Sequence, residues 1–478
     1  MSQEVQLQPL QPGTFRELVH VALPLVISAG SHSLMSVADR VMLSGYTPSA
    51  GFAEAAGHSA STTLDMIAAV TPASMLHWTA VCVPLGTILY ANTFISQFDG
   101  ARQPRQLATA FWQAVWLAFV CGILLTGLIP FSYGIFRFVG HTDAVAVQET
   151  AYFNTLCRGS VLLLMSMALS CFFSGRRQTR VVMTINLVSV AINVALDYLL
   201  VFGRIGLPEL GIAGAAWATV LARGCDVLLY SFLIHRTRSS HGLPLKETWR
   251  PDRTLLKQYL RYGVPSGFHS LADNAAFLTF LFIVGSLNRD AMAATNLAFS
   301  VNSLVFVPLL GFGTAVQTLV GHHLGARLQS AAVRTVWTAV ALAIVWTGSA
   351  AVLLLWLPDL ALKPFLLLTD GSSSASGIGS VLPLAETLLR FVALYSVFDA
   401  LAVVVASALR GAGDTLFPMI VTMVSGWLVM TIPAWLIVRS GDATIQKLWL
   451  TCSAHIILMG VTMLARFMSG RWKQLKLT

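Results

Sequence analysis

The sequence predicts an all-α integral membrane protein, with twelve transmembrane helices arranged as two six-helix bundles. Three observations predict this fold class: charged residues are scarce, apolar residues gather in twelve long stretches, and the two halves of the chain share motifs in the same order. Hydrophobic residues make up 56% of the 478 residues and charged residues only 11%, whereas about 25% of the residues of a typical soluble domain are charged. This composition excludes a large soluble enzyme, a disordered chain and a nucleic-acid-binding domain.

Twelve stretches are long and apolar enough to cross a bilayer, which takes about 20 residues per helix. The first six spans are expected at residues 15–43, 64–96, 107–133, 146–173, 180–203 and 211–235. The second six are expected at residues 256–285, 291–320, 331–358, 382–409, 415–438 and 446–467. The most polar stretch of the chain separates the two sets. We therefore expect an N-terminal tail (1–14), an N-terminal bundle (15–235), a linker (236–254), a C-terminal bundle (255–468) and a C-terminal tail (469–478).

The positions of the basic residues predict the orientation of the spans. Of the thirty lysines and arginines, twenty fall on the side of the termini and the linker, seven on the opposite side and three within spans. Cytoplasmic segments of membrane proteins are enriched in lysine and arginine, so we expect both termini in the cytoplasm. The formal net charge of +9 then reflects topology and attraction to anionic lipid head groups, and not a nucleic-acid surface.

An internal repeat relates the two halves. The second span ends in TFISQFDGAR (93–102) and the eighth in TLVGHHLGAR (318–327). The fourth and tenth spans end in SGRRQT (174–179) and RGAGDT (410–415), and the first and seventh carry ALP (22–24) and GVP (263–265). Because each half has an even number of spans, the repeats have the same orientation in the membrane. Many secondary transporters are built from two such repeats with a site between them.

Four carboxylates fall inside predicted spans, where an ionisable group is costly and usually serves a site. They are Asp39, Asp197, Asp273 and Asp399, two in each half. Two other acids, Asp65 and Asp226, lie nearer to span ends, and we expect those to be solvated.

Two pairs of residues in consecutive spans have a spacing of four, so that each pair projects from one face of its helix. They are Asn193 with Asp197 and Ala215 with Thr219. Carboxylate, amide, hydroxyl and carbonyl oxygens suit a hard cation such as sodium, and two nearby carboxyl groups equally suit a shared proton. The sequence does not distinguish between a sodium site and a proton site.

No motif of an enzyme or of a bound cofactor is found. The six cysteines are scattered without a CxxC pair, and the eleven histidines form no metal-binding pattern. His322 and His323 are expected at the membrane interface. Because HExxH, GxSxG and Walker motifs are also missing, we expect no catalytic residue, no resident cofactor and no enzymatic activity.

Four short motifs, at these positions in a chain of two six-span halves, resemble the multidrug and toxic compound extrusion (MATE) family: NVALDYLLVFG, LGIAGAAWATV, LVGHHLGAR and SALRGAGDT. The likeness extends from about residue 15 to residue 468. It implies two six-helix bundles around a V-shaped central cavity, exporting organic and often cationic compounds in exchange for Na⁺ or H⁺. It further implies small organic substrates, contact with membrane lipids, no nucleic-acid partner, a monomer, and a place in a bacterial inner membrane.

The resemblance also assigns site residues. It gives a cation-coupling site in the N-terminal bundle formed by Asp39, Tyr152, Asn193, Asp197, Ala215 and Thr219, in which Asp39, Asn193, Asp197 and Thr219 are candidate ligands of Na⁺. Asp273 and Asp399 are secondary candidates in the C-terminal bundle. The sequence departs from the family where Arg40 follows Asp39, and where Asp273 stands in place of a glutamate.

A related function on a similar fold is the export or flipping of lipid-linked or polysaccharide precursors. Such a transporter is expected to line its cavity with basic residues that bind pyrophosphate. The charges inside the predicted spans are mainly acidic, which favours cationic cargo.

Overall fold

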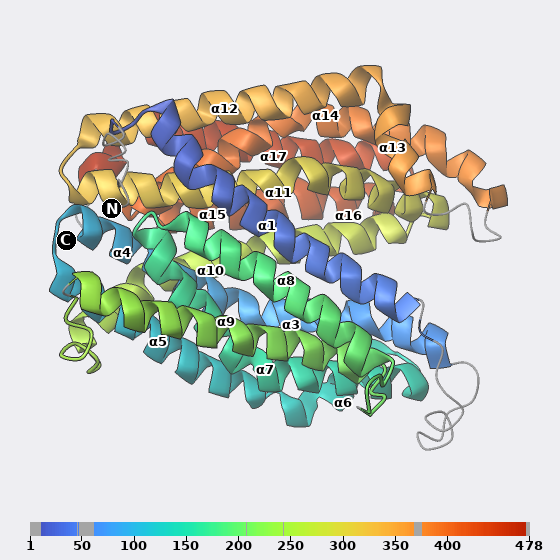
Figure 1. The fold of residues 1–478 in the computed structure, drawn as a ribbon. Helices are drawn as coiled ribbons and strands as arrows, with labels where there is room; N and C mark the ends of the chain where they lie inside the picture. Colours follow the sequence, from blue (N-terminus) through green and yellow to red (C-terminus); the bar gives the residue numbers. More distant parts are fainter. Residues whose placement is uncertain are drawn as a thin grey trace. The chain divides into compact units, whose positions relative to one another are not determined.

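The computed structural model describes residues 11–44, 46, 62–206, 208–241, 243–367 and 375–474. In these ranges the regular structure is entirely helical (Figure 1). The helices of the first half are α1 (Phe15–Ser44), α3 (Thr62–Leu89), α4 (Ala91–Gly100), α5 (Pro104–Thr126), η1 (Ile129–Phe131), α6 (Ser132–Val139), α7 (Asp143–Gly175), α8 (Thr179–Val201) and α9 (Ile212–His241). Those of the second half are α10 (Arg253–Gly285), α11 (Arg289–Gly325), α12 (Gln329–Trp356), α13 (Pro358–Leu367), α14 (Ala375–Ala412), α15 (Leu416–Ser425), η2 (Gly426–Thr431), α16 (Ile432–Arg439), α17 (Ile445–Met468) and η3 (Arg471–Gln474).

Within the described residues, twelve helical segments are long and apolar enough to cross a membrane. The prediction of twelve spans is therefore confirmed, and the chain is a multi-pass membrane protein. Several predicted spans correspond to more than one helix. The second consists of α3 and α4, and the eleventh of α15, the π-helical turn η2 and α16.

The chain divides into two compact units, which do not coincide with the two halves of the sequence. The N-unit comprises Ile27–Gly267, and the C-unit comprises Phe268–Thr478 together with Met1–Val26. Helix α1 therefore begins in the C-unit and ends in the N-unit, whereas α10 begins in the N-unit and ends in the C-unit.

Each unit is organised around one long helix. In the N-unit α7 packs against α3, α5 and α9, and in the C-unit α14 packs against α11, α12 and α17. The described core of the C-unit contains fully buried aromatic side chains such as Phe280, Tyr395 and Trp449, and Trp449 donates its indole N–H to Thr295 Oγ1 at 3.2 Å. Helices α7 and α14 are the fourth and tenth spans, which occupy equivalent places in the two halves.

The first part of α1, which belongs to the C-unit, and the first part of α10, which belongs to the N-unit, make equivalent close contacts. A Cβ atom added to Gly86 of α3 would lie 2.5 Å from the Cα of Gly267, and one added to Gly311 of α11 would lie 2.5 Å from the Cα of Val26. Gly86 and Gly311 are separated by 225 residues, and Val26 and Gly267 by 241, the separations that also relate the repeated motifs. Small residues let membrane helices approach closely, so each unit uses the same backbone contact.

The repeated motifs at the helix ends form the same cap in both halves. Arg102 and Arg327 have φ angles of 55° and 60°. The amide of each donates to a carbonyl three residues earlier, and the amide of the following residue donates to a carbonyl five residues earlier, with distances of 2.7 to 3.1 Å. This pattern is a Schellman cap, in which one residue adopts the left-handed conformation. The SGRRQT and RGAGDT motifs repeat it with Arg177 and Gly413.

The contact at Gly267 generates a testable prediction. A Cβ added there would meet the carbonyl oxygen of Val83 at 2.3 Å, so Gly267→Ala must push α10 away from α3. Overpacking of this kind costs about 1–3 kcal/mol, and we expect the midpoint of thermal unfolding in detergent to fall by several degrees, measured by size-exclusion chromatography after heating.

Gly348→Ala is the matched control, because nothing lies within 4 Å of a Cβ added at Gly348 of α12. We expect its midpoint to stay at or slightly above that of the wild type. Equal midpoints for the two variants would contradict the importance of the close contact.

Candidate functional site

Three helices of the N-unit carry side chains that line up along one face at intervals of three or four residues, the spacing that keeps residues on one side of a helix. Together they form a seam of mainly polar residues. Helix α1 contributes Ser28, Ser31, Met35 and Asp39; α8 contributes Asn186, Ser189, Asn193 and Asp197; and α9 contributes Ala215, Thr219, Arg223 and Asp226.

At one end of the seam the structure brings together four of the predicted site residues. The side chains of Asp197, Asn193 and Thr219 lie close enough to the carboxyl group of Asp39 to act on it electrostatically. Asn193 donates from Nδ2 to Thr219 Oγ1 at 3.5 Å, and Thr219 Oγ1 in turn donates to the carbonyl oxygen of Ala215 at 3.2 Å. Asn193 and Asp197 have no solvent exposure and Asp39 is 9% exposed. The spacing of four in α8 and α9 therefore does place these groups on one shared surface.

This end of the seam has more acceptors than donors. Within the described residues, Asp39 Oδ1, both carboxylate oxygens of Asp197 and Asn193 Oδ1 are buried and accept no hydrogen bond. Buried polar atoms in proteins are nearly always hydrogen-bonded. An ionised carboxylate only accepts hydrogen bonds, so Asp39 and Asp197 can pair only when a proton or another cation lies between them. The cluster therefore has the groups with which a cation could be held between Asp39 and Asp197.

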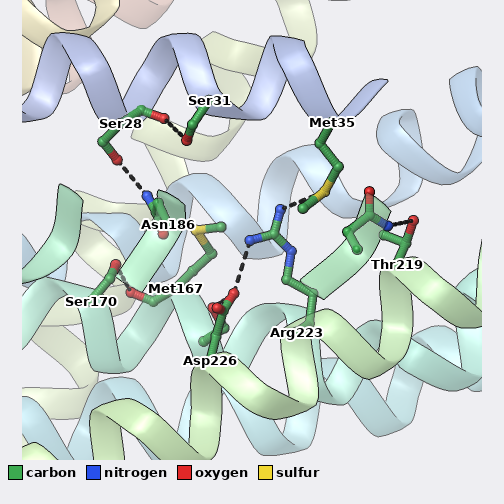
Figure 2. A network of polar contacts seen from close by, with 11 residues as sticks. Ser28, Ser31, Met35, Met167, Ser170, Asn186, Thr219, Arg223 and Asp226 are labelled. Atoms are coloured by element: carbon green, nitrogen blue, oxygen red, sulfur yellow. Dashed lines mark hydrogen bonds and ion pairs between the residues drawn. The ribbon is translucent and has the colours of Figure 1, made fainter. Parts of the chain in front are cut away.

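Arg223 is a functional candidate that the sequence analysis missed. It is 6% exposed, and its Nη1 donates to Asp226 Oδ2 at 3.1 Å while Nη2 donates to Met35 Sδ at 3.7 Å. Figure 2 shows the guanidinium between α1 and α9, and its charge also acts on the Asp39 carboxyl. The signal was present in the sequence, because Arg223 continues the series that begins at Ala215 and Thr219 by another four residues.

Asp226 was expected to be solvated, and that expectation is wrong. Helix α9 continues for fifteen residues beyond it to His241, so Asp226 lies in the middle of the helix and has no solvent exposure. Besides Arg223, its carboxylate accepts a hydrogen bond from Ser166 Oγ of α7 at 3.3 Å and interacts with Ser189 of α8. The pair is thus a buried ion pair that connects three helices.

The other end of the seam connects α1 to α8. Asn186 donates from Nδ2 to Ser28 Oγ, and Ser31 Oγ donates to the carbonyl oxygen of Ser28 at 2.7 Å (Figure 2). All three side chains are buried. Helix α1 is therefore held by polar contacts at both ends of its N-unit portion, with Asp39 at one end and Ser28 at the other.

The remaining predicted residues of this site lie beside the cluster. Tyr152 of α7 is 4% exposed, in the same buried core group as Ala215 and Leu43. Just beyond α1, Tyr46 donates its hydroxyl to Glu209 Oε1 at 2.6 Å. Burial and the Glu209 carboxylate raise the pKa of Tyr46, so its hydroxyl stays a donor. The side chain of Arg40 lies outside the described residues.

The C-unit holds the two secondary candidates. Asp273 of α10 and Asp399 of α14 are half-buried and interact electrostatically with each other. The charge of Arg410, also on α14, acts on Asp273, and its Nη1 lies 3.5 Å from His269 Nδ1. Each unit thus contains a pair of interacting membrane acids, with an arginine whose charge acts on one acid of the pair.

One histidine expected at the interface is buried instead. His323 is 1% exposed, and its Nε2 lies 3.3 Å from Glu17 Oε1 while its Nδ1 lies 3.2 Å from Thr335 Oγ1. The first turn of α1 covers it, because Glu17 is itself 3% exposed. His323 therefore fastens the start of α1 within the C-unit.

The Arg223–Asp226 pair predicts a stability effect. Removing one partner of a buried ion pair costs about 3–5 kcal/mol, whereas replacing both by apolar residues is often neutral. We expect Arg223→Leu to lower the thermal midpoint in detergent and Arg223→Leu/Asp226→Leu to recover much of the loss. Arg439→Leu, at an exposed arginine over the ring of Trp435, is the control and should change little. A double variant less stable than the single one would contradict charge compensation within the pair.

Comparison with known proteins gives consistent results over nearly the whole chain. A probable multidrug resistance protein NorM of Thermotoga maritima is 24% identical over 464 residues, which cover 97% of this chain and 94% of that protein. The multidrug resistance protein PmpM of Pseudomonas aeruginosa is 26% identical over 414 residues, covering 86% of this chain and 81% of that protein.

Solved structures share the fold. An outward-facing multidrug resistance MATE family transporter of the MOP superfamily matches with a TM-score of 0.83 and 18% identity, covering 96% of this chain and 97% of that chain. A MOP superfamily transporter from Pyrococcus furiosus, described as having a binding pocket of reverse polarity, matches with a TM-score of 0.82 and 19% identity over the same shares. The predicted fold class is confirmed. A family model described as MatE matches residues 24–199 and 265–436, which is well over half of the chain, and the protein therefore belongs to the MatE family.

Proposed function

We propose that this protein exports organic compounds across the membrane in exchange for a cation that binds at Asp39 and Asp197. The observation that carries this proposal is the cluster of buried oxygens without donors at the meeting point of α1, α8 and α9. The relatives named multidrug resistance proteins support the proposal that the cargo is an organic compound. We further propose a bacterial inner-membrane location, cytoplasmic termini and a monomeric transporter.

The coupling would depend on the charge of the cluster. Asp39, Asp197 and Asp226 are three carboxyl groups, and Arg223 supplies one guanidinium. When the coupling cation is absent, the unneutralised carboxylates attract an organic cation, since an uncompensated charge at membrane depth is costly. When H⁺ or Na⁺ binds between Asp39 and Asp197, that attraction is lost and the cargo is released.

Helix α1 is the element through which this change would spread. Asp39 lies near one end of α1, and the other end belongs to the C-unit. Pro24 interrupts the helical hydrogen bonding of α1 close to the boundary at Val26, and proline is a common cause of helix kinks. Binding of a cation at Asp39 would therefore change the bend of α1, and a change of bend alters access to the cargo.

Both coupling ions fit the donor set. Sodium would take oxygens from Asp39, Asp197, Asn193 and Thr219, whereas a proton requires only the two carboxyl groups. Export of pyrophosphate-linked precursors is less favoured, because the ionisable groups gathered at the two described clusters include more acids than arginines.

Variants of the paired acids test the site. We expect Asp39→Asn and Asp197→Asn each to slow efflux of ethidium from cells by roughly tenfold or more, the range of typical coupling energies between two ligands. Asp442→Asn is the control, because Asp442 is an exposed partner of Lys447 and its change should leave efflux intact. If both variants, expressed at the level of the wild type, exported ethidium as fast as the wild type, the proposed cation site at Asp39 and Asp197 would be wrong.

Separately imposed gradients test the coupling ion. In proteoliposomes, we expect either a proton gradient or a sodium gradient to drive ethidium transport, and Asp39→Asn to abolish the effect of the driving gradient. The reason is that only an ion that binds between the two carboxyl groups can neutralise them. Transport indifferent to both gradients would contradict the proposed antiport.

A further inference from the structure

The N-unit contains a cavity of about 720 Å³ that lies apart from the polar seam. Its walls come from α5, α7, α9 and the segment 243–250 that follows α9. The lining is largely apolar and aromatic, with Phe111, Trp112 and Trp116 from α5 and Trp249 from the segment after α9. The volume falls within the range of about 300–1,000 Å³ that is usual for small-molecule sites.

The segment that closes the cavity is fastened to α5. Trp112 donates its indole N–H to the carbonyl oxygen of Leu245 at 2.8 Å, and Trp116 donates to that of Trp249, also at 2.8 Å. Between them, Gln113 accepts from the amide of Asp252 at 3.2 Å. Three residues of α5 in nearly continuous sequence therefore hold the wall in place, so the cavity is a built feature of the unit.

The helices on either side of the cavity present apolar side chains outward. Ile123 and Leu124 of α5 are 48% and 69% exposed, and Leu228 and Phe232 of α9 are 71% and 62% exposed. In a membrane-spanning helix such side chains face the lipid hydrocarbon. Ser231, which lines the cavity, is the immediate neighbour of Phe232. The cavity is thus placed where an acyl chain of the bilayer can enter it.

Basic side chains lie at the cavity and in the linker beside it. Lys246 and His235 both line the cavity and are exposed. Arg250, four residues after Lys246, is exposed as well. The linker from residue 236 to residue 253 contains five basic residues and two acidic ones, of which Glu247 lies next to Lys246. Tryptophan and basic residues together are typical of the level of the lipid head groups.

We propose that this cavity binds an anionic phospholipid from the leaflet on the side of the linker, with an acyl chain between Trp112, Trp116 and Trp249 and the phosphate group at Lys246. The aromatic lining and the neighbouring lipid-facing helices select a chain from the bilayer. The excess of positive charge selects an anionic head group over a zwitterionic one. A soluble phosphate compound would bring no apolar part to fill the cavity.

Native mass spectrometry of the purified full-length protein tests both parts of the proposal. Delipidated protein is mixed with phosphatidylglycerol or phosphatidylcholine, and the fraction carrying one lipid is measured. We expect the wild type to retain phosphatidylglycerol in preference to phosphatidylcholine. Lys246→Glu should weaken retention of phosphatidylglycerol by fivefold or more, taking roughly fivefold as the effect of one basic residue near an anionic head group. Ser231→Trp, which fills the cavity, should abolish retention of both lipids.

Two matched variants serve as controls. Ser349→Trp makes the same change at an exposed serine of α12, and Lys363→Glu makes the same change at an exposed lysine of α13. Both should bind phosphatidylglycerol like the wild type. Should Ser231→Trp fail to elute as a single species, the smaller Ser231→Phe replaces it, and the thermal stabilisation by phosphatidylglycerol is measured as a second readout.

Three results would overturn the proposal. Equal retention of phosphatidylglycerol and phosphatidylcholine by the wild type would remove the role of the head group. Undiminished retention by both the serine and the lysine variants would place the bound lipid elsewhere. Displacement of the lipid by ethidium at the same cavity would identify the occupant as a transported compound instead.

Discussion

The need to compensate buried charge in an apolar protein is the constraint on which the arrangement of the N-unit depends. Asp197 and Asp226 have no solvent exposure, and Asp39 and Arg223 have little. An unpaired charge in such surroundings is costly, so α1, α8 and α9 must present matching polar faces to one another. In the Arg223–Asp226 pair the two side chains compensate each other's charge. The charges of Asp39 and Asp197 are compensated only when a cation is added. The first pair is therefore structural, and the second is a candidate site of exchange.

The two units share a scaffold but not its chemistry. The glycine contacts of α3 and α11 and the Schellman caps at Arg102 and Arg327 repeat at constant separations, because backbone packing must be the same for each half to fold alike. The acids within the spans do not repeat: at the separation of 241 that relates Val26 to Gly267, the position equivalent to Asp39 is Phe280. Each unit nevertheless contains a pair of interacting acids and an arginine whose charge acts on one of them, and these residues come from different positions in the two halves. The two copies of the scaffold thus carry their ionisable groups at different positions.

Helix α9 serves two environments with two faces. Thr219, Arg223 and Asp226 face the polar seam, whereas Ser231 and His235 line the cavity between α5, α7 and α9. At about 100° per residue, the two sets point about 80° to 180° apart around the helix axis. A lipid in the cavity and a cation at the seam would therefore bind the same helix without competing for the same atoms. The hydrogen bonds of Trp112 and Trp116 fasten the segment after α9 to α5. The residues that wall the cavity therefore also help to hold α9, the helix that carries Arg223.

The sequence by itself determined the twelve spans, whose ends mostly agree with the helices to within about four residues, because a long apolar stretch has no alternative in a bilayer to forming a helix. It also predicted that Asn193 and Asp197 share a face with one another, and Ala215 with Thr219, because that follows from helical periodicity alone. Only the tertiary structure decided that Asp226 is buried against Arg223. The length of α9 and the packing of α7 against it cannot be derived from the spacing of residues along the sequence. It alone divided α1 and α10 between the units at Val26 and Gly267, because that division depends on which distant helix each backbone can approach closely.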